Sequence, residues 1–177
     1  MTDRGMVMKY VYCPACGKKL TSKYSYDEGN IPSCDHCNTL YFDTPKPTVV
    51  VAVIKEDEIL LLKQSYIYKN SKVLVSGYVS QGETVEETVG REVQEETGIA
   101  IKDIKYLGSC SIQEKELLML TYMANYSSGT LVKSQEVEGV EWVKITDALS
   151  QMEEDLVGRT VVKRVLEELS KNNFLSN

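Results

Sequence analysis

The hydrophobic pattern changes along the chain and predicts a series of strands. Residues 48–55 form a β-branched run, TVVVAVIK, which is typical of a buried strand. A polar turn then leads into a second strand at residues 59–63, so these two strands are expected to form a hairpin. Apolar segments at residues 101–112, 117–126 and 139–145 favour further strands. The sheet is therefore expected to draw its strands from many parts of the chain.

Two other segments have helical periodicity. Residues 85–97 carry an apolar stripe with a period of four, formed by Val85, Val89 and Val93. Thr84 and Glu87 form a capping box before this stripe, and Gly98 is placed where a left-handed cap would end the helix. A second amphipathic helix is expected over residues 160–171. Strands, a helix, more strands and a last helix together predict an α/β sandwich around a mixed sheet.

A domain boundary is expected at the segment Thr44-Pro45-Lys46-Pro47. Proline lacks the amide that a sheet ladder needs, and it restricts the residue before it, so this segment is not expected to continue a sheet. Residues 1–44 precede the boundary and residues 45–177 contain the patterned strands and helices. We therefore expect two domains with these limits.

The first domain contains two CxxC pairs, formed by Cys13, Cys16, Cys34 and Cys37. Two such pairs at this separation are typical of a zinc ribbon, in which four thiolates complete a tetrahedral Zn²⁺ site. Four protein ligands leave no open position for water, so this zinc is expected to be structural. The alternative is a pair of disulfides, which would require an oxidising compartment.

The charge of the first domain bears on its partners. Residues 1–44 hold five basic and five acidic residues, so residues 45–177 carry the whole net charge of −6. A ribbon that binds nucleic acid is expected to be basic, and a nucleic-acid partner is therefore not expected. Its tyrosines either stack on bases or form the apolar face of the module, and we favour the apolar face. They are Tyr10, Tyr12, Tyr24, Tyr26 and Tyr41.

The overall composition is that of a globular protein in water. Of the 177 residues, 42% are hydrophobic and 26% are charged. No apolar run approaches the roughly 18 residues that cross a membrane, and the N-terminus lacks the apolar region of a secretory signal. We therefore expect a cytoplasmic protein with no membrane partner.

The helix over residues 85–97 carries a cluster of carboxylates. Glu92, Glu95 and Glu96 are spaced i, i+3 and i+4, so they share one face and repel one another. Oxygen ligands at this density suit Mg²⁺ or Mn²⁺, which often share such sites with phosphates. The loop before the helix leads to its N-terminus, where amides favour anions. A metal-assisted diphosphate site is the favoured interpretation, and a solvated acidic face is the alternative.

The stretch Gly77 to Ile99, GYVSQGETVEETVGREVQEETGI, contains the complete Nudix box pattern. Residues 48–170 resemble a Nudix hydrolase domain, and the preceding ribbon resembles that of NADH pyrophosphatases. The resemblance implies an α/β/α sandwich with a mixed sheet. The chain differs from NADH pyrophosphatases after the box, where it has SCSIQEKEL at residues 109–117 in place of their SQPWPFPxS marker.

The resemblance also implies which residues act. Mg²⁺ or Mn²⁺ is expected on acidic side chains of the box and of a later loop, namely Glu92, Glu95, Glu96 and Glu136. Glu138 is the alternative loop residue. Arg91 is expected to orient a catalytic glutamate through a charged hydrogen bond. These helix glutamates and Arg91 are the expected catalytic residues, and spacing leaves open which glutamate is the general base.

Four further residues are expected near the substrate. Gly77 and Gly82 allow the backbone to approach phosphates closely. Tyr66 and Tyr68 lie in a polar loop before the box, where they either contact the substrate or cover the edge of the core.

The function implied by the resemblance is metal-dependent hydrolysis of the diphosphate linkage in a nucleoside diphosphate derivative. NADH, ADP-ribose or a related dinucleotide-like small molecule is the expected substrate, and a homodimer is the assembly that the resemblance suggests. Two alternatives remain, a non-catalytic regulator that senses a nucleotide and an enzyme that removes the 5′ NAD cap of RNA.

Overall fold

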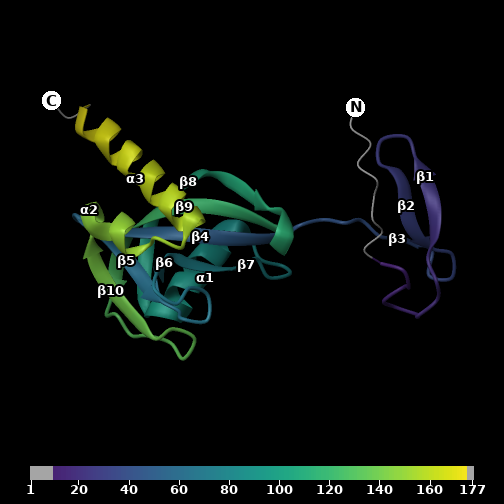
Figure 1. Cartoon of the computed structure of the whole chain (residues 1–177), viewed down its shortest axis with the longest axis horizontal. Coiled ribbons are helices and arrows are strands. Elements are labelled where there is room, and N and C mark those ends of the chain that lie inside the picture. Colours follow the sequence, from purple (N-terminus) through teal and green to yellow (C-terminus); the bar gives the residue numbers. More distant parts are fainter. Residues whose placement is uncertain (1–9, 175–177) are drawn as a thin grey trace. The chain divides into compact units, whose positions relative to one another are not determined.

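The chain is organised as two compact units, Met1–Pro45 and Lys46–Asn177. The structure is a computed structural model, and it describes residues 10–174. Each unit has its own sheet, three-stranded in the first and seven-stranded in the second (Figure 1). Within the described residues, no helix is long and apolar enough to cross a membrane.

The first unit is a small antiparallel sheet folded around the four cysteines. Its strands are β1 (Thr21–Ser25), β2 (Gly29–Cys34) and β3 (Thr39–Leu40), in that spatial order. Gly29 has φ +75°, a left-handed conformation that lets the chain reverse between β1 and β2. Cys13, Leu20 and Cys34 are buried, and Tyr41 packs against them. Cysteine side chains therefore form most of the core of this unit.

The tyrosines of the first unit do not form a common apolar face. Tyr41 packs into the core, and the ring of Tyr10 lies 6.0 Å from it. Tyr12, Tyr24 and Tyr26 are exposed, the last of them by 96%. The predicted role in packing is therefore wrong for these three residues. A single thin sheet has no second layer under which their rings could be buried.

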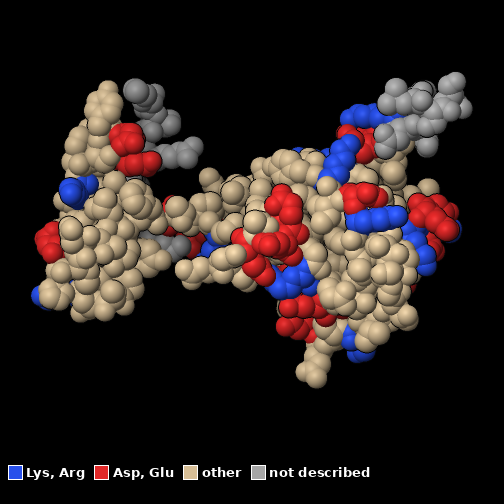
Figure 2. All heavy atoms as spheres, turned by 180° about the vertical axis from the view of Figure 1, so that it is seen from behind, with Lys and Arg blue, Asp and Glu red and all other residues tan. Residues whose placement is uncertain are grey.

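Charged side chains gather on the second unit. On the face shown in Figure 2, acidic and basic groups lie side by side over the larger unit. The described residues of the smaller unit are mostly uncharged on that face, and they form no basic patch there.

The second unit is a mixed sheet with helices on both faces. Its strands are β4 (Lys46–Lys55), β5 (Glu58–Lys63), β6 (Lys72–Val73), β7 (Val75–Tyr78), β8 (Ile99–Ile112), β9 (Leu117–Gly129) and β10 (Gly139–Lys144). Its helices are α1 (Val85–Thr97), η1 (Gln113–Lys115), α2 (Ile145–Ala148), η2 (Leu149–Gln151) and α3 (Leu156–Phe174). The main strand order is β10-β5-β4-β9-β8, with β6 on β5 and β7 on β4. Only β4 and β9 are parallel among the described pairs, so the predicted mixed sheet is confirmed.

The central strand β4 divides the core into two layers. Val50, Ala52 and Ile54 pack in the cluster that includes α3, while alternate residues such as Val49 and Val51 pack in the cluster that includes α1. Figure 1 shows α1 and α3 on opposite faces of the sheet. Full burial of one such valine contributes about 1.5–3 kcal/mol. The predicted α/β/α sandwich is thus confirmed.

Strand β4 changes its antiparallel partner along its length. Its last two residues, Ile54 and Lys55, pair with β5, and the expected hairpin is therefore present. Its earlier residues 48–51 pair with β7 instead, which places Gly77 opposite Val49. The chain that leaves β5 must consequently loop out before it returns as β6 and β7. Gly77, the first residue of the box, therefore lies on β7 beside β4, and the chain continues from it into α1.

Several element boundaries differ from the sequence prediction. Strand β4 begins at Lys46 and includes Pro47, whose carbonyl accepts the amide of Val79 at 3.1 Å. Proline is accommodated because it lies at the exposed start of the strand. Strand β9 runs past residue 126 to Gly129, since its last residues pair with the start of β8. Helix α3 begins at Leu156 rather than residue 160, after Asp155 accepts the amide of Gly158 at 2.9 Å.

Candidate active site

Helix α1 begins and ends where the sequence predicts. The hydroxyl of Thr84 accepts the amide of Glu87 at 3.2 Å, and the Glu87 carboxylate accepts the amide of Thr84 at 2.8 Å. Gly98 has φ +73°, and its amide donates to the carbonyl of Gln94. Val89 and Val93 are fully buried. Because both caps and the buried stripe are fixed, the rotation of the acidic residues about the helix axis is fixed as well.

Arg91 is the centre of an ionic cluster on this helix. Its Nε and one terminal nitrogen bind the two carboxylate oxygens of Glu83 at 2.7 and 2.9 Å, which holds the pKa of Glu83 down at about 2. The other terminal nitrogen donates to Glu92 and to Glu95, each at 2.9 Å. The carbonyl of Tyr78 accepts a further hydrogen bond at 3.2 Å. Arg91 therefore orients three carboxylates and ties the helix to the preceding loop.

Gly77 makes room for Glu92. A Cβ atom at Gly77 would lie 1.9 Å from the carboxyl carbon of Glu92, which no real contact allows. Burial raises the pKa of Glu92, and the adjacent Arg91 opposes that rise. Gly82 instead has φ +89° with open space around it, and it does not line the cavity. The two glycines thus serve different needs, close side-chain approach at Gly77 and a left-handed turn at Gly82.

Glu96 lies deepest of the helix glutamates. It is 5% exposed, and its Oε1 accepts a hydrogen bond from Nε2 of Gln64 at 3.3 Å. Its Oε2 is buried and makes no hydrogen bond within the described residues. Burial raises its pKa to about 7, and the negative charge of Glu92 adds to this rise. A buried carboxylate oxygen with no donor is costly unless a cation binds it, so these residues fit a divalent metal.

A cavity of about 540 Å³ opens beside these residues. Most of the residues predicted for the site line it, namely Tyr66, Tyr68, Gly77, Arg91, Glu92, Glu96 and Glu136. Glu95 does not line it, and 58% of its side chain is exposed. Glu138, the alternative loop residue, binds the amide and hydroxyl of Ser65 at 3.1 and 2.6 Å. The structure therefore brings Glu136 to the helix glutamates and places Glu138 elsewhere.

Gln64 is a residue at the site that sequence reasoning missed. It directly follows the apolar strand predicted over residues 59–63, and the structure buries it. Its partner, Glu96, is 32 positions away in the sequence, so no local pattern connects the two residues.

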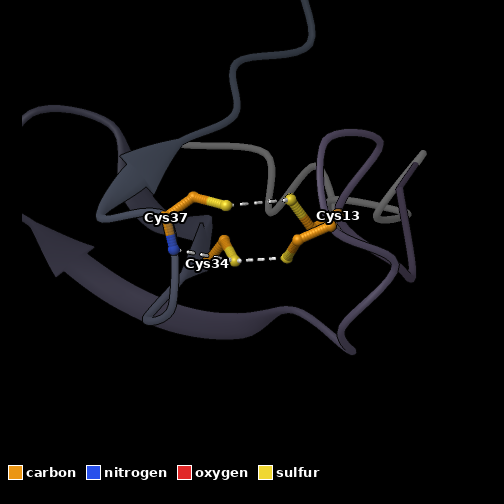
Figure 3. Close-up of side chains that lie close together, drawn as sticks. Cys13, Cys34 and Cys37 are labelled. Atoms are coloured by element: carbon orange, nitrogen blue, oxygen red, sulfur yellow. Dashed lines mark hydrogen bonds between the residues drawn. The ribbon is translucent and has the colours of Figure 1, made fainter.

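The four cysteines of the first unit converge on one point (Figure 3). The Sγ atoms of Cys13 and Cys37 are 3.9 Å apart, and those of Cys16 and Cys34 are 3.5 Å apart. A tetrahedral zinc ion with Zn–S bonds of about 2.3 Å spaces its ligands about 3.8 Å apart, whereas a disulfide needs about 2.0 Å. All four are free thiols, and their ligand atoms lie within 4.8 Å of one another. The geometry fits a single Zn²⁺ and not two disulfides.

The hydroxyl of Tyr41 lies 3.0 Å from the Sγ of Cys13. This hydrogen bond lowers the pKa of Cys13 to about 6, which favours the thiolate that a metal binds. Tyr41 thus joins the core of the unit to one of its four candidate ligands.

Comparison with known proteins places the second unit in a family. The family model described as "NUDIX domain" matches residues 44–165. The chain belongs to the Nudix family. This confirms the resemblance that the box indicated, and the box itself supplies α1 and the loop before it.

Several curated proteins have similar sequences. The NAD-capped RNA hydrolase NudC of Vibrio parahaemolyticus serotype O3:K6 is 28% identical over 165 residues, which are 93% of this chain and 62% of that protein. The NudC of Escherichia coli O1:K1 / APEC is 32% identical over 137 residues, 77% of this chain and 52% of that protein. The chain thus spans less than two thirds of the length of these relatives.

A solved Nudix structure has the same fold. The crystal structure of a NUDIX hydrolase from Nitrosomonas europaea aligns with a TM-score of 0.75 and 20% sequence identity. The alignment covers 90% of this chain and 92% of that one. At this identity the likeness supports the fold alone.

Proposed function

We propose that the Nudix unit hydrolyses the diphosphate linkage of a nucleoside diphosphate derivative with Mg²⁺ or Mn²⁺. The observation that carries the proposal is the buried Oε2 of Glu96, which has no hydrogen-bond partner among residues 10–174. Glu96 lines one cavity together with Glu92 and Glu136. Carboxylates gathered around a cavity of ligand size suit a metal that bridges to phosphate oxygens. Membership of the Nudix family also leads us to expect metal-dependent hydrolysis of a diphosphate linkage.

The residues of the chain have separate roles in this proposal. The metal is held by Glu92, Glu96 and Glu136, with Glu95 at the exposed edge. When bound, the metal neutralises the diphosphate and lowers the pKa of the attacking water. Arg91 keeps the carboxylates of Glu92 and Glu95 in position through its hydrogen bonds. A carboxylate of this cluster accepts the proton of the water.

The rest of the cavity is proposed to hold the groups attached to the diphosphate. Tyr66 and Tyr68 both line it, with Tyr66 72% exposed and free to contact a ligand. Gly77 lets the backbone approach the phosphates, and Gly82 shapes the loop that precedes α1. We propose a small-molecule substrate such as NADH, ADP-ribose or a related dinucleotide.

The first unit is proposed to be a structural zinc ribbon over residues 1–44, followed by a Nudix domain over residues 45–177. Its four thiols provide a closed ligand set, so the zinc would stabilise the fold and take no part in the chemistry. We also propose that the protein is cytoplasmic and that it forms a homodimer.

Removal of the NAD cap from RNA is the second candidate function. The relatives reported above are NAD-capped RNA hydrolases, and exposed rings such as Tyr24 and Tyr26 could stack on bases. RNA affinity that falls steeply between two salt concentrations would favour this candidate. Affinity that is weak at both would favour the small-molecule substrate.

The decisive experiment is a hydrolysis panel with NADH, NAD⁺, ADP-ribose, FAD, diadenosine polyphosphates and nucleoside triphosphates in Mg²⁺ or Mn²⁺. Native protein and Glu96→Gln are compared, and Glu167→Gln on the exposed side of α3 is the matched control. We expect native protein and the control to release mononucleotide from one class, and Glu96→Gln to release almost none. Binding of a nucleotide by native protein without any turnover would replace the proposal with a nucleotide-sensing regulator.

A further inference from the structure

Gln64 is a buried polar residue to which the proposed function gives no role. It directly follows β5 and is 2% exposed. Its backbone carbonyl accepts the amides of Ile67 at 2.9 Å and Tyr68 at 3.2 Å. The preceding residue, Lys63, pairs with Gly139 of β10. The backbone therefore fixes the position of Gln64 from both sides.

The side chain of Gln64 reaches across the unit to the last turn of α1. Its Nε2 donates to Oε1 of Glu96 at 3.3 Å, and both residues line the cavity. The second oxygen of Glu96, Oε2, is buried and has no hydrogen-bond partner among the described residues. One oxygen of Glu96 is thus occupied by an amide, and the other remains to accept a ligand.

Glu96 differs from the neighbouring carboxylates in the charge of the group that donates a hydrogen bond to it. Arg91 donates to Glu83, Glu92 and Glu95, and among the described residues it makes no hydrogen bond to Glu96. A cationic donor at Glu96 would offset part of the negative charge that attracts a divalent metal. The neutral amide of Gln64 restrains the side chain and leaves its negative charge available. The site therefore pairs Glu83, Glu92 and Glu95 with a cation, and it pairs Glu96, its deepest carboxylate, with a neutral amide.

We propose that Gln64 is a positioning residue that holds Glu96 in the orientation required to bind the divalent metal. The inference rests on the proposed metal-dependent function. Gln64 acts through Glu96, because its Nε2 is engaged with that carboxylate. Partners of this kind typically change metal affinity by about 10–100-fold when they are removed.

The test measures the affinity of the full chain for Mn²⁺ alone, by electron paramagnetic resonance without nucleotide. Gln64→Met keeps the length of the side chain and removes the donor. We expect it to weaken Mn²⁺ binding by about 10-fold. In the Glu96→Gln background the same substitution should cause no further loss, since its target is gone. Gln94→Met, an exposed glutamine on α1, is the matched control and should bind Mn²⁺ as native protein does.

A kinetic measurement distinguishes positioning from a purely structural role. If Gln64 acts on the metal site, raised Mn²⁺ should restore the activity of Gln64→Met, and KM for the nucleotide should stay near the native value. A general loss of fold would not be reversed by metal. Should Gln64→Met fail to fold, Gln64→Asn retains an amide that is one methylene too short to reach Glu96, and the same loss of affinity is expected.

The outcomes separate the inference from the function on which it rests. Native-like Mn²⁺ affinity in Gln64→Met, together with weaker binding in Glu96→Gln, would overturn the role of Gln64 and leave the metal site intact. Equal affinity in native protein and Glu96→Gln would overturn the proposed metal role of Glu96, and with it the inference. An additive loss in the double variant would also overturn the inference, because Gln64 would then act independently of Glu96.

Discussion

The two candidate metal sites of this protein are built in opposite ways. In the first unit, four thiols converge within 4.8 Å around one point, and two of them, Cys13 and Cys34, are almost fully buried. On α1, carboxylates lie around Arg91. The deepest helix glutamate, Glu96, lines a cavity, and one of its oxygens has no hydrogen-bond partner in the part of the chain that the structure describes. A closed set of ligands suits an ion that stays with the fold. A set with a compensating cation and an open side suits an ion that meets a substrate.

The largest effect is expected from Cys34→Ser, which breaks the closed site. Structural zinc contributes on the order of 10–16 kcal/mol in small zinc modules, so losing one ligand should unfold the first unit. We expect zinc content to fall well below one ion per chain by mass spectrometry, while the Nudix unit retains Mn²⁺ binding.

Cys110→Ser is the matched control for that experiment. Cys110 lies on β8, outside the four-cysteine group, and its replacement should leave the zinc content unchanged. Simultaneous loss of fold and activity throughout the chain in Cys34→Ser would contradict the view that the two units are independent.

Glu96→Gln should separate activity from stability at the open site. Loss of a carboxylate that binds metal or accepts a proton is expected to lower kcat by about 10²–10⁴-fold. The folded-state pKa of about 7 lies above the unfolded value, so the charge opposes folding increasingly as pH rises from 4.5 through 7. Thermal unfolding at pH 8 should therefore occur at an equal or higher temperature in the variant. A clear drop in unfolding temperature would show that Glu96 is needed for the fold.

Gly77→Ala tests whether the open site depends on the exact position of Glu92. The added Cβ would meet the carboxyl group of Glu92, and this flexible side chain can move away at little cost in stability. We expect about a 10–100-fold loss in metal affinity or activity with a small change in unfolding temperature.

Gly90→Ala is the matched control on the same helix. A Cβ at Gly90 would meet no atom of the described residues within 4 Å, so this substitution should raise helix stability by roughly 0.5–1 kcal/mol and preserve activity. Equal activity in Gly77→Ala and Gly90→Ala would show that the placement of Glu92 does not matter.

Glu83→Gln is expected to have the smallest effect, and one that depends on pH. The Arg91 guanidinium holds the pKa of Glu83 at about 2, below its usual value, so the ion pair stabilises the fold above about pH 4.5 and this contribution is lost as pH falls to 2. Chemical denaturation should show a small stability difference from native protein at pH 7 that vanishes near pH 2. A difference that is independent of pH would point to packing instead of charge.

The sequence predicts best where neighbouring residues determine the structure. The caps at Thr84 and Gly98 define α1 from hydrogen bonds within four residues, and both are found in the structure. The four-cysteine group was also predictable, because the spacing of two CxxC pairs is typical of a shared metal site.

Features that depend on distant segments were predicted poorly. Strand β9 continues beyond the predicted end at residue 126 to Gly129, because the start of β8 pairs with its last residues. Gln64 was missed because its hydrogen-bond partner, Glu96, lies on another element of the fold.

The change of partner along β4 has an evolutionary consequence. Residues 65–71 form a loop between β5 and β6. This loop lies beside the cavity and takes no part in the strand pairing of the sheet. It includes Tyr66 and Tyr68 but none of the proposed metal ligands. Substitutions at Tyr66 or Tyr68 would change the wall of the cavity while the glutamates of α1 keep their places on the helix. Sequence divergence at these two positions is thus separable from divergence of the proposed metal ligands.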